Sequence, residues 1–238
     1  MPIASPESRF LYPFACALLV GLSLPAMAET FTYTVIFGGV NVGHLTAEVK
    51  GDQTTIDYNV KNNGRGPTIA ETIKLDADGL PTEWRIDGAT TFGSKVTERF
   101  ARHGARAEWV DSTGKGHADV RTPSLYVGQS ASPWADGLYA RALLKVAGRQ
   151  LPAFPGGVLH LEKGETLTVQ GSGGPVEVTR YDLLGLDLQP DTILLDPKGN
   201  LFASVDSSSI LVRAGYEGEE QRLRGLASTW STERLVNI

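Results

Sequence analysis

The segment 132–148, SPWADGLYARALLKVAG, is the strongest helix signal in a sequence that otherwise consists of short, strand-like stretches. Ser132 suits the N-cap, and Pro133 suits the first helical position because the N–H that proline lacks would have no partner there. Asp136 falls in the first turn, where the helix dipole favours a negative charge. Gly148 is placed to end the helix.

Apolar residues recur at helical spacing over most of the circumference of this segment. They are Ala135, Leu138, Tyr139, Ala140, Ala142, Leu143, Leu144 and Val146. A helix this apolar must be covered on most of its sides. The remainder of the chain therefore has to wrap around it.

The stretches before this helix alternate apolar and polar residues, and turn signals separate them about every ten residues, which is typical of an antiparallel meander. The expected strands are 31–37, 44–50, 54–61, 69–76, one through Trp84 and Ile86, one through Val96, Glu98 and Phe100, and 105–111, with a turn at 114–116. We therefore predict a mainly β (α+β) fold. An antiparallel curved sheet or half-barrel should wrap around one central apolar helix, residues 132–147.

After the helix we expect a crossing loop at 151–157 and then strands at 158–162, 166–170, 176–184, 192–195, 201–205 and 210–213. From residue 217 the apolar spacing becomes helical again, which predicts a C-terminal amphipathic helix. This segment, 217–238, is either a docking segment or linker toward another part, or a terminal helix packed on its own sheet. Residues 29–216 form the β-rich domain.

Residues 1–28 have the pattern of a signal peptide, with a short apolar core followed by the small residues Ala26 and Ala28 around a cleavage position. Cleavage after Ala28 would leave a periplasmic or secreted chain with no stable membrane span. The alternative is an uncleaved membrane anchor. The only cysteine, Cys16, lies in this segment, so the mature chain would have neither a disulfide nor a thiol nucleophile.

The charge pattern argues against nucleic acid as a partner. The chain has 22 Lys and Arg against 27 Asp and Glu, and no basic run.

No group of residues matches a known catalytic or metal-binding motif. His160 with Glu162, and His117 with Asp119, each place two ligand types on one strand face, but a zinc site needs three or four ligands. The stretch 128–132 comes close to a nucleophile elbow but lacks its final glycine. We assign no catalytic, metal-ligating or cofactor-binding residue and expect no cofactor in this chain.

A curved sheet around an apolar helix offers one physical function. If the helix can move out of the concavity, Trp134, Leu138, Tyr139 and Leu143 would line an apolar pocket for a lipid or another small hydrophobic ligand. If the helix fills the concavity, the domain is a solid scaffold. The four tryptophans of the chain, Trp84, Trp109, Trp134 and Trp230, are interpreted as packing residues.

Three segments together resemble a known family: YTVIFGGVNVGHLTAEV near the start, SLYVGQSASPWADGLYARALLKVAGRQLPAFPGG in the middle, and ILLDPKGNLFASV later. They are similar to the β-rich N-terminal accessory region of exported bacterial metal-dependent amidohydrolases. In that family a catalytic (β/α)₈ barrel follows this region, and its histidine motifs are not present in this sequence. The resemblance therefore carries no catalytic residue to this chain.

The resemblance implies a non-catalytic scaffold that packs against a catalytic barrel domain or mediates a homo-oligomer. The alternative is a stand-alone periplasmic binding module for a lipid or small hydrophobic ligand, similar to periplasmic lipoprotein carriers. A third reading is a hydrolase whose site follows no motif recognised above.

Overall fold

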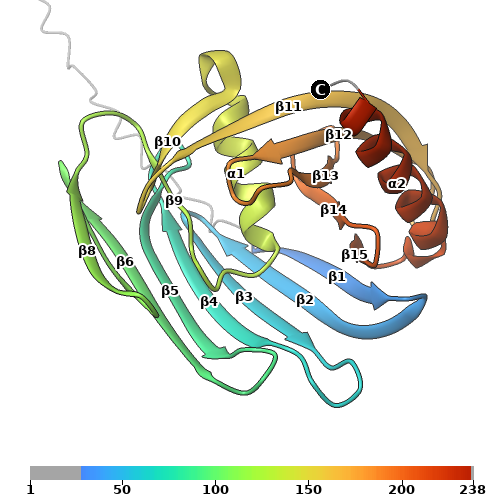
Figure 1. Cartoon of the computed structure of the whole chain (residues 1–238), viewed down its shortest axis with the longest axis horizontal. Helices are drawn as coiled ribbons and strands as arrows, with labels where there is room; N and C mark the ends of the chain where they lie inside the picture. Colours follow the sequence, from blue (N-terminus) through green and yellow to red (C-terminus); the bar gives the residue numbers. More distant parts are fainter. Residues whose placement is uncertain (1–27, 237–238) are drawn as a thin grey trace, which may run out of the picture.

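One sheet of fifteen strands curves around a helix in the computed structural model, which describes residues 28–236 (Figure 1). The strand order is β8-β7-β6-β5-β4-β3-β2-β1-β15-β14-β13-β12-β11-β10-β9, so β8 and β9 are its two edges. The predicted mainly β fold, with a curved, unclosed sheet around a central helix and a second helix at the C-terminus, is confirmed. The sheet is antiparallel except for β9, which pairs in parallel with β10.

The first half of the sheet is a meander in which each strand lies antiparallel beside its predecessor. Its strands are β1 (Glu29–Phe37), β2 (Val40–Lys50), β3 (Gln53–Val60), β4 (Thr68–Leu75), β5 (Pro81–Ala89), β6 (Lys95–His103), β7 (Arg106–Asp111) and β8 (Gly114–Asp119). Buried and exposed side chains alternate along most of them, because one face of the sheet points to the core and the other to solvent.

The second half continues from β9 (Leu125–Tyr126) through α1 (Trp134–Leu144) and the 3₁₀ turn η1 (Ala147–Arg149) into six further strands. These are β10 (Gln150–Phe154), β11 (Val158–Val169), β12 (Val176–Leu184), β13 (Asp191–Leu195), β14 (Leu201–Val205) and β15 (Ser209–Arg213). The chain ends in the 3₁₀ turn η2 (Glu217–Glu219) and α2 (Glu220–Val236). Pairing of β1 with β15 joins the two halves.

Helix α1 fills the hollow of the sheet, and its side chains form the centre of the main core. It packs closely against β14, because Gly137 faces Leu201: a Cβ atom at Gly137 would lie 2.7 Å from the Leu201 Cβ. The backbone of Leu201 is held in place, since its carbonyl accepts a hydrogen bond of 2.7 Å from the Tyr33 hydroxyl. A larger residue at 137 would therefore push helix and sheet apart.

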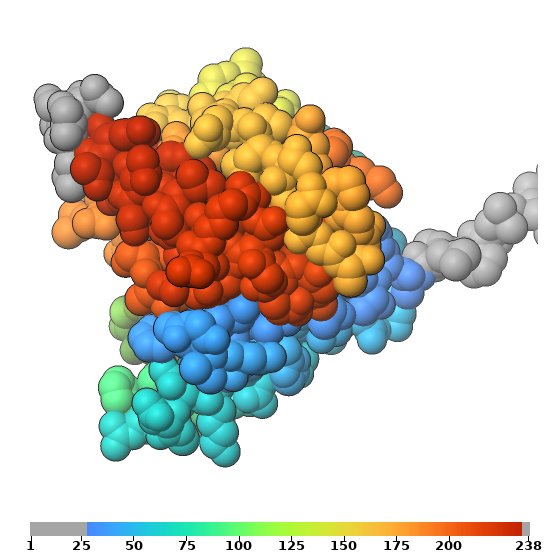
Figure 2. Space-filling view, turned by 90° about the vertical axis from the view of Figure 1, so that its right-hand side faces the viewer, coloured from blue at the N-terminus to red at the C-terminus, as the bar shows by residue number. Residues whose placement is uncertain are grey.

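Helix α2 covers the opposite face of the C-terminal strands, where a second core forms (Figure 2). Among the described side chains of α2, the buried apolar ones are Leu223, Ala227 and Trp230, and they pack in one cluster with Phe202 and Val212. The strands between the two helices are thus buried on both faces. This explains why β13 and β15 read as continuous apolar runs rather than as alternating ones. The sequence allowed two interpretations of the C-terminal segment, and the structure supports the second: α2 is a terminal helix packed on its own sheet.

Several predicted boundaries need correction. Helix α1 begins after Pro133 with no side-chain cap, so Ser132 is not the N-cap, and it ends at Leu144 rather than at 147. Residues 151–157, expected as a loop because of their prolines and glycines, include most of β10, which pairs with β11 and with β9. The strands predicted at 158–162 and 166–170 are one irregular strand, β11. The turn expected at 114–116 belongs to β8.

The predicted signal peptide lies almost entirely outside the described residues, at 1–27. Within the part of the chain that the structure describes, no helix has the length and apolar character needed to cross a membrane.

Aromatic stacking connects the two halves of the sheet near its open edges. Phe100 on β6 stacks on Tyr126 of β9 with ring centroids 4.3 Å apart, and Trp109 on β7 stacks on Phe154 of β10 at 5.9 Å. These aromatic contacts therefore hold the two edges of the sheet near each other, which keeps the sheet curved like a barrel.

Two buried carboxyl groups fasten the segment that leads into α1. Glu98, 2% exposed, accepts hydrogen bonds from the Tyr126 hydroxyl at 2.6 Å and from the backbone N–H groups of Gln129 and Ser130 at 2.9 and 3.0 Å. Glu71, also 2% exposed, accepts from the Ser132 N–H at 2.7 Å and from the Trp84 indole N–H at 2.8 Å. Four polar groups of residues 126–132 are satisfied in this way, and the start of α1 is fixed to β4 and β6.

The close approach at Gly137 predicts an effect opposite to helix propensity. Gly137→Ala should lower the free energy of unfolding by about 1–2 kcal/mol, because overpacking outweighs the propensity gain of alanine. Gly225→Ala in α2 is the matched control: nothing lies within 4 Å of the added Cβ, so this variant should be stabilised by about 0.5–1 kcal/mol. Urea unfolding of both variants measures the difference, and stabilisation of both would contradict the packing described here.

The carboxyl anchor at Glu98 predicts a second stability effect. Glu98→Gln places an amide NH₂ where a backbone N–H now donates, so it should lower the free energy of unfolding by about 2–3 kcal/mol. Glu48→Gln is the control, because Glu48 is exposed and its one ion pair among the described residues is with Lys50 at 3.3 Å. Its loss should stay within about 0.5 kcal/mol. Equal losses in the two variants would show that Glu98 anchors nothing.

Candidate functional site

A cleft of about 820 Å³ opens at the end of the half-barrel where α1 begins. Its lining comes from the first turn of α1 and the segment before it, from Tyr58 on β3, and from the loops that follow β7, β10 and β12. The chain directions in the sheet bring these segments to the same end, because β3, β7 and β12 all run toward it. The volume is within the range of roughly 300–1,000 Å³ that is usual for small-ligand sites.

Apolar and aromatic side chains make up much of the cleft wall. They are Tyr58, Val127, Ala131, Pro133, Ala135, Tyr139, Pro155 and Leu186. A wall of this kind can accept the apolar part of a ligand.

Four carboxyl groups from different segments also line the cleft: Asp111, Asp136, Asp187 and Asp191. No lysine, arginine or histidine is among the described residues that line it. Asp111 is engaged by its own turn, since it accepts hydrogen bonds from the Thr113 N–H at 2.7 Å and the Thr113 hydroxyl at 2.6 Å. Within residues 28–236, the other three acids accept no hydrogen bond from a turn of their own, and Asp136 accepts a long hydrogen bond of 3.4 Å from the Ser204 hydroxyl.

The pKa values of Asp136 and Asp191 are raised, as expected for buried acids without a cation among the described lining residues. Burial raises the pKa of Asp136 to about 8, and the charge of Asp191 adds to this effect. The pKa of Asp191 is raised as well, by burial and by the charges of Asp187 and Asp206. Burial, together with the charge of Asp136, raises the pKa of Tyr58 to about 12. Each raised pKa means that the ionised form of the side chain is destabilised, because the described lining residues supply no cation to compensate its charge.

The segment that forms one side of the cleft is held from within. Besides its bonds to Glu71 and Glu98, it is tied by Gly128, whose N–H donates to the Tyr139 hydroxyl at 3.1 Å. Burial raises the pKa of Glu71 to about 7, although its bonds to Ser132 and Trp84 lower it. This side of the cleft is therefore preformed, as is usual for a small-ligand site.

The cleft acids were not predicted from the sequence: Asp136 was assigned only a place in the first helical turn, and Asp111, Asp187 and Asp191 were assigned no role. The two buried anchors did carry a signal. Glu71 lies between Ile69 and Ile73, and Glu98 between Val96 and Phe100, at inward positions of otherwise apolar strand faces.

The residues expected to line an apolar concavity are all buried in the main core. Trp134, Leu138 and Leu143 are 1%, 2% and 0% exposed. Tyr139, 1% exposed, is the one of the four that also borders the cleft.

The residue pairs that were considered for chemistry lie apart from the cleft. His160 and Glu162 are on β11, where Glu162 pairs with Arg234 at 3.4 Å, and His117 and Asp119 are on β8. Among residues 28–236, no three His, Cys, Asp or Glu side chains are grouped closely enough to hold a metal ion. Ser132 is 2% exposed, and no histidine is among the residues that line the cleft beside it.

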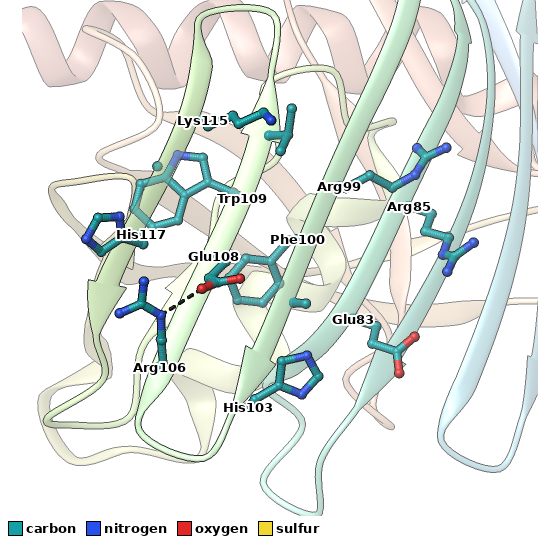
Figure 3. Close-up of a pocket in the computed structure, with 13 residues that line it drawn as sticks. Glu83, Arg85, Arg99, Phe100, His103, Arg106, Glu108, Trp109, Lys115 and His117 are labelled. Carbon is teal, nitrogen blue, oxygen red and sulfur yellow. Dashed lines mark hydrogen bonds and ion pairs between the residues drawn. The ribbon is translucent and has the colours of Figure 1, made fainter.

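A second hollow, of about 640 Å³, lies on strands β5 to β8 (Figure 3). Its lining mixes charges of both signs, and several are already paired: Arg106 with Glu108 at 2.7 Å, and Arg99 with Asp87 at 2.8 Å. Both of these pairs are exposed to solvent. We interpret this hollow as a solvated strand face.

The comparisons with known proteins give no family. No protein-family model matches the sequence, and no curated protein matches it. One similar solved structure is the crystal structure of a β-barrel-like protein of the domain of unknown function DUF1849 from Brucella abortus. It has 11% identity and a TM-score of 0.47, and the match covers 81% of this chain and 98% of that one. Another is a DUF1089 family protein from Pseudomonas aeruginosa, with 14% identity and a TM-score of 0.40, covering 68% of this chain and 89% of that one.

The resemblance to the accessory region of amidohydrolases is wrong. The structural comparison points to these domains of unknown function and not to a region that accompanies an amidohydrolase barrel. The scaffold function that depended on this resemblance has no other support.

Proposed function

We propose that this protein is a binding module and that the cleft at the start of α1 holds a small amphipathic ligand with a basic group. The alternative in the sequence analysis, a stand-alone binding module for a lipid or small hydrophobic ligand, is retained in this modified form. The signal-like pattern of residues 1–28 supports a site of action in the periplasm or outside the cell.

The observation that carries the proposal is the group of acids in the cleft that lack a cationic partner among the described lining residues. Asp136, Asp187 and Asp191 line the cleft, where the described lining residues include no lysine, arginine or histidine, and the pKa values of Asp136 and Asp191 are raised. An ammonium group on the ligand would supply the missing positive charge. At about 4 Å and an effective dielectric constant near 20, such a contact is worth about 4 kcal/mol before desolvation is subtracted.

The wall of the cleft favours an amphipathic ligand over a fully polar one. Val127, Ala135 and Leu186 offer apolar contacts, and Tyr58 and Tyr139 border the same space. A neutral acyl chain would satisfy these contacts but would leave the acids without a partner. A simple metal ion would satisfy the acids but leave the apolar wall unused.

Binding of a short-chain quaternary ammonium compound tests the proposal. Hexyltrimethylammonium should bind saturably with one site per chain, whereas hexanoate, with a similar chain and the opposite charge, should not bind. Asp136→Asn combined with Asp191→Asn should weaken binding at least tenfold, a loss of about 1.4 kcal/mol. Isothermal titration calorimetry or ligand-observed NMR can measure this.

The control for this experiment is Asp57→Asn, because Asp57 is exposed and pairs with His44 at 3.1 Å, away from the cleft lining. It should bind like the wild type. Equal binding of the ammonium and the carboxylate compound, or unchanged affinity in the double variant, would refute the proposal.

The raised pKa values also predict how stability depends on pH. In the folded chain Glu71 and Asp136 hold their protons up to about pH 7 and 8, well above the ordinary values of 4.5 and 3.8. The folded state therefore binds more protons than the unfolded state between about pH 4 and 8, so the free energy of unfolding should fall as the pH rises through this window. Asp136→Asn should reduce the slope and raise the melting temperature at pH 8, with little effect at pH 4.5. Thermal unfolding across this range would contradict the assignment if the variant had the slope of the wild type.

A further inference from the structure

The exposed large apolar side chains gather at one end of the sheet. Phe37 and Val40 flank the β1–β2 turn, Phe92 is in the β5–β6 turn, and Leu188 follows β12. Val158 begins β11, and Val110 is next to the last residue of β7. Strand directions place all of these positions at the end where the cleft opens. None of the exposed large apolar residues that the structure describes lies at the opposite end.

Two neighbouring loops at this end combine an exposed aromatic ring with positive charge. We call residues 61–67 and 89–95, the β3–β4 loop and the β5–β6 turn, the basic tip. Lys61, Arg65 and Lys95 are exposed there, and Phe92 is 81% exposed. Figure 1 shows the two loops projecting side by side from the lower edge of the sheet, and residues of both line one hollow of about 440 Å³.

The three cations of the basic tip have no anionic partner in the described part of the chain. None of them takes part in an ion pair there, and residues 61–67 and 89–95 contain neither aspartate nor glutamate. The chain as a whole carries a formal net charge of −5. The tip is therefore a local positive site on an acidic protein.

We propose that the basic tip docks on the surface of a lipid bilayer that contains anionic headgroups. Positive charge complementary to the headgroups surrounds a side chain, Phe92, that can enter the interfacial region without moving the backbone. The hollow between Arg65 and Phe92 can take up a headgroup. A soluble anionic polymer would meet the same charges but would leave Phe92 in water. This proposal does not depend on the identity of the ligand in the cleft.

Docking in this way gives the bilayer a defined place relative to the cleft. The cleft and the basic tip are at the same end of the sheet. The tip would hold the mouth of the cleft toward the membrane surface.

Vesicle flotation of residues 29–238, the chain without the predicted signal peptide, tests the proposal. The protein should float with vesicles of phosphatidylcholine that contain 30 mol% phosphatidylglycerol, a composition on the order of that of an anionic leaflet, and not with pure phosphatidylcholine. Phe92→Ala should lower the partition coefficient at least fivefold. Arg65→Glu combined with Lys95→Glu should lower it at least tenfold.

The matched control is Lys163→Glu combined with Lys198→Glu. Both lysines are exposed, neither is in an ion pair within the described residues, and the change in net charge is the same. This control should partition like the wild type. Circular dichroism confirms that each variant is folded, which is expected because all the positions are on the surface.

Three outcomes would overturn the proposal. The first is no flotation of the wild type with anionic vesicles. The second is an equal loss in the control variant, which would make binding a matter of net charge alone. The third is unchanged flotation of Phe92→Ala together with equally tight binding to soluble polyglutamate, which would make the partner a soluble polyanion.

Discussion

The hydrogen bonds that residues 126–132 donate to Glu71 and Glu98 are the contacts on which the rest of the structure depends. The segment that donates them crosses from β9 into α1 over the interior of the sheet. The Ser132 N–H is buried, and without Glu71 as its acceptor it would cost roughly 1–3 kcal/mol. The N–H groups of Gln129 and Ser130 are partly buried, and Glu98 accepts from both. The two acids let an irregular stretch of chain lie against an apolar core, and they set where α1 begins.

The position of α1 in turn determines what the sheet can enclose. The helix is buried along most of its length, so the concavity of the half-barrel is filled and the remaining space is at its first turn. Asp136 is in that turn. A carboxylate at this position benefits from the helix dipole, but burial next to Asp191 raises its pKa to about 8. The dominance of burial over the dipole is the electrostatic feature that distinguishes this cleft from a solvated hollow such as the one on β5 to β8.

Much of the fold could be predicted from the sequence, because most strands have one buried face and the alternation of side chains records it. The limits of β10 and β11 could not be predicted. Pro152 within β10 and Pro155 directly after it give this stretch the composition of a loop, and an irregular register divides β11 into two apparent strands. The cleft could not be predicted either. Asp136 and Asp191 are 55 positions apart, and only the crossing of α1 over the sheet brings them together. Glu71 and Glu98 carried a signal, an acid within an inward apolar row, but a pattern of this kind does not say which buried donors the acid meets.

The distribution of charge at the open end of the sheet relates the cleft to the basic tip. Acids line the cleft, while the cations of Lys61, Arg65 and Lys95 are in two loops that contain no acid. If the charges were mixed, they would neutralise one another and leave neither an acidic cleft nor a basic surface. With the charges separated in this way, the loops can attract an anionic surface while the cleft attracts a cation. A ligand with a basic group is itself concentrated at an anionic surface, so the same field that would draw the tip to a bilayer would bring such a ligand to the mouth of the cleft.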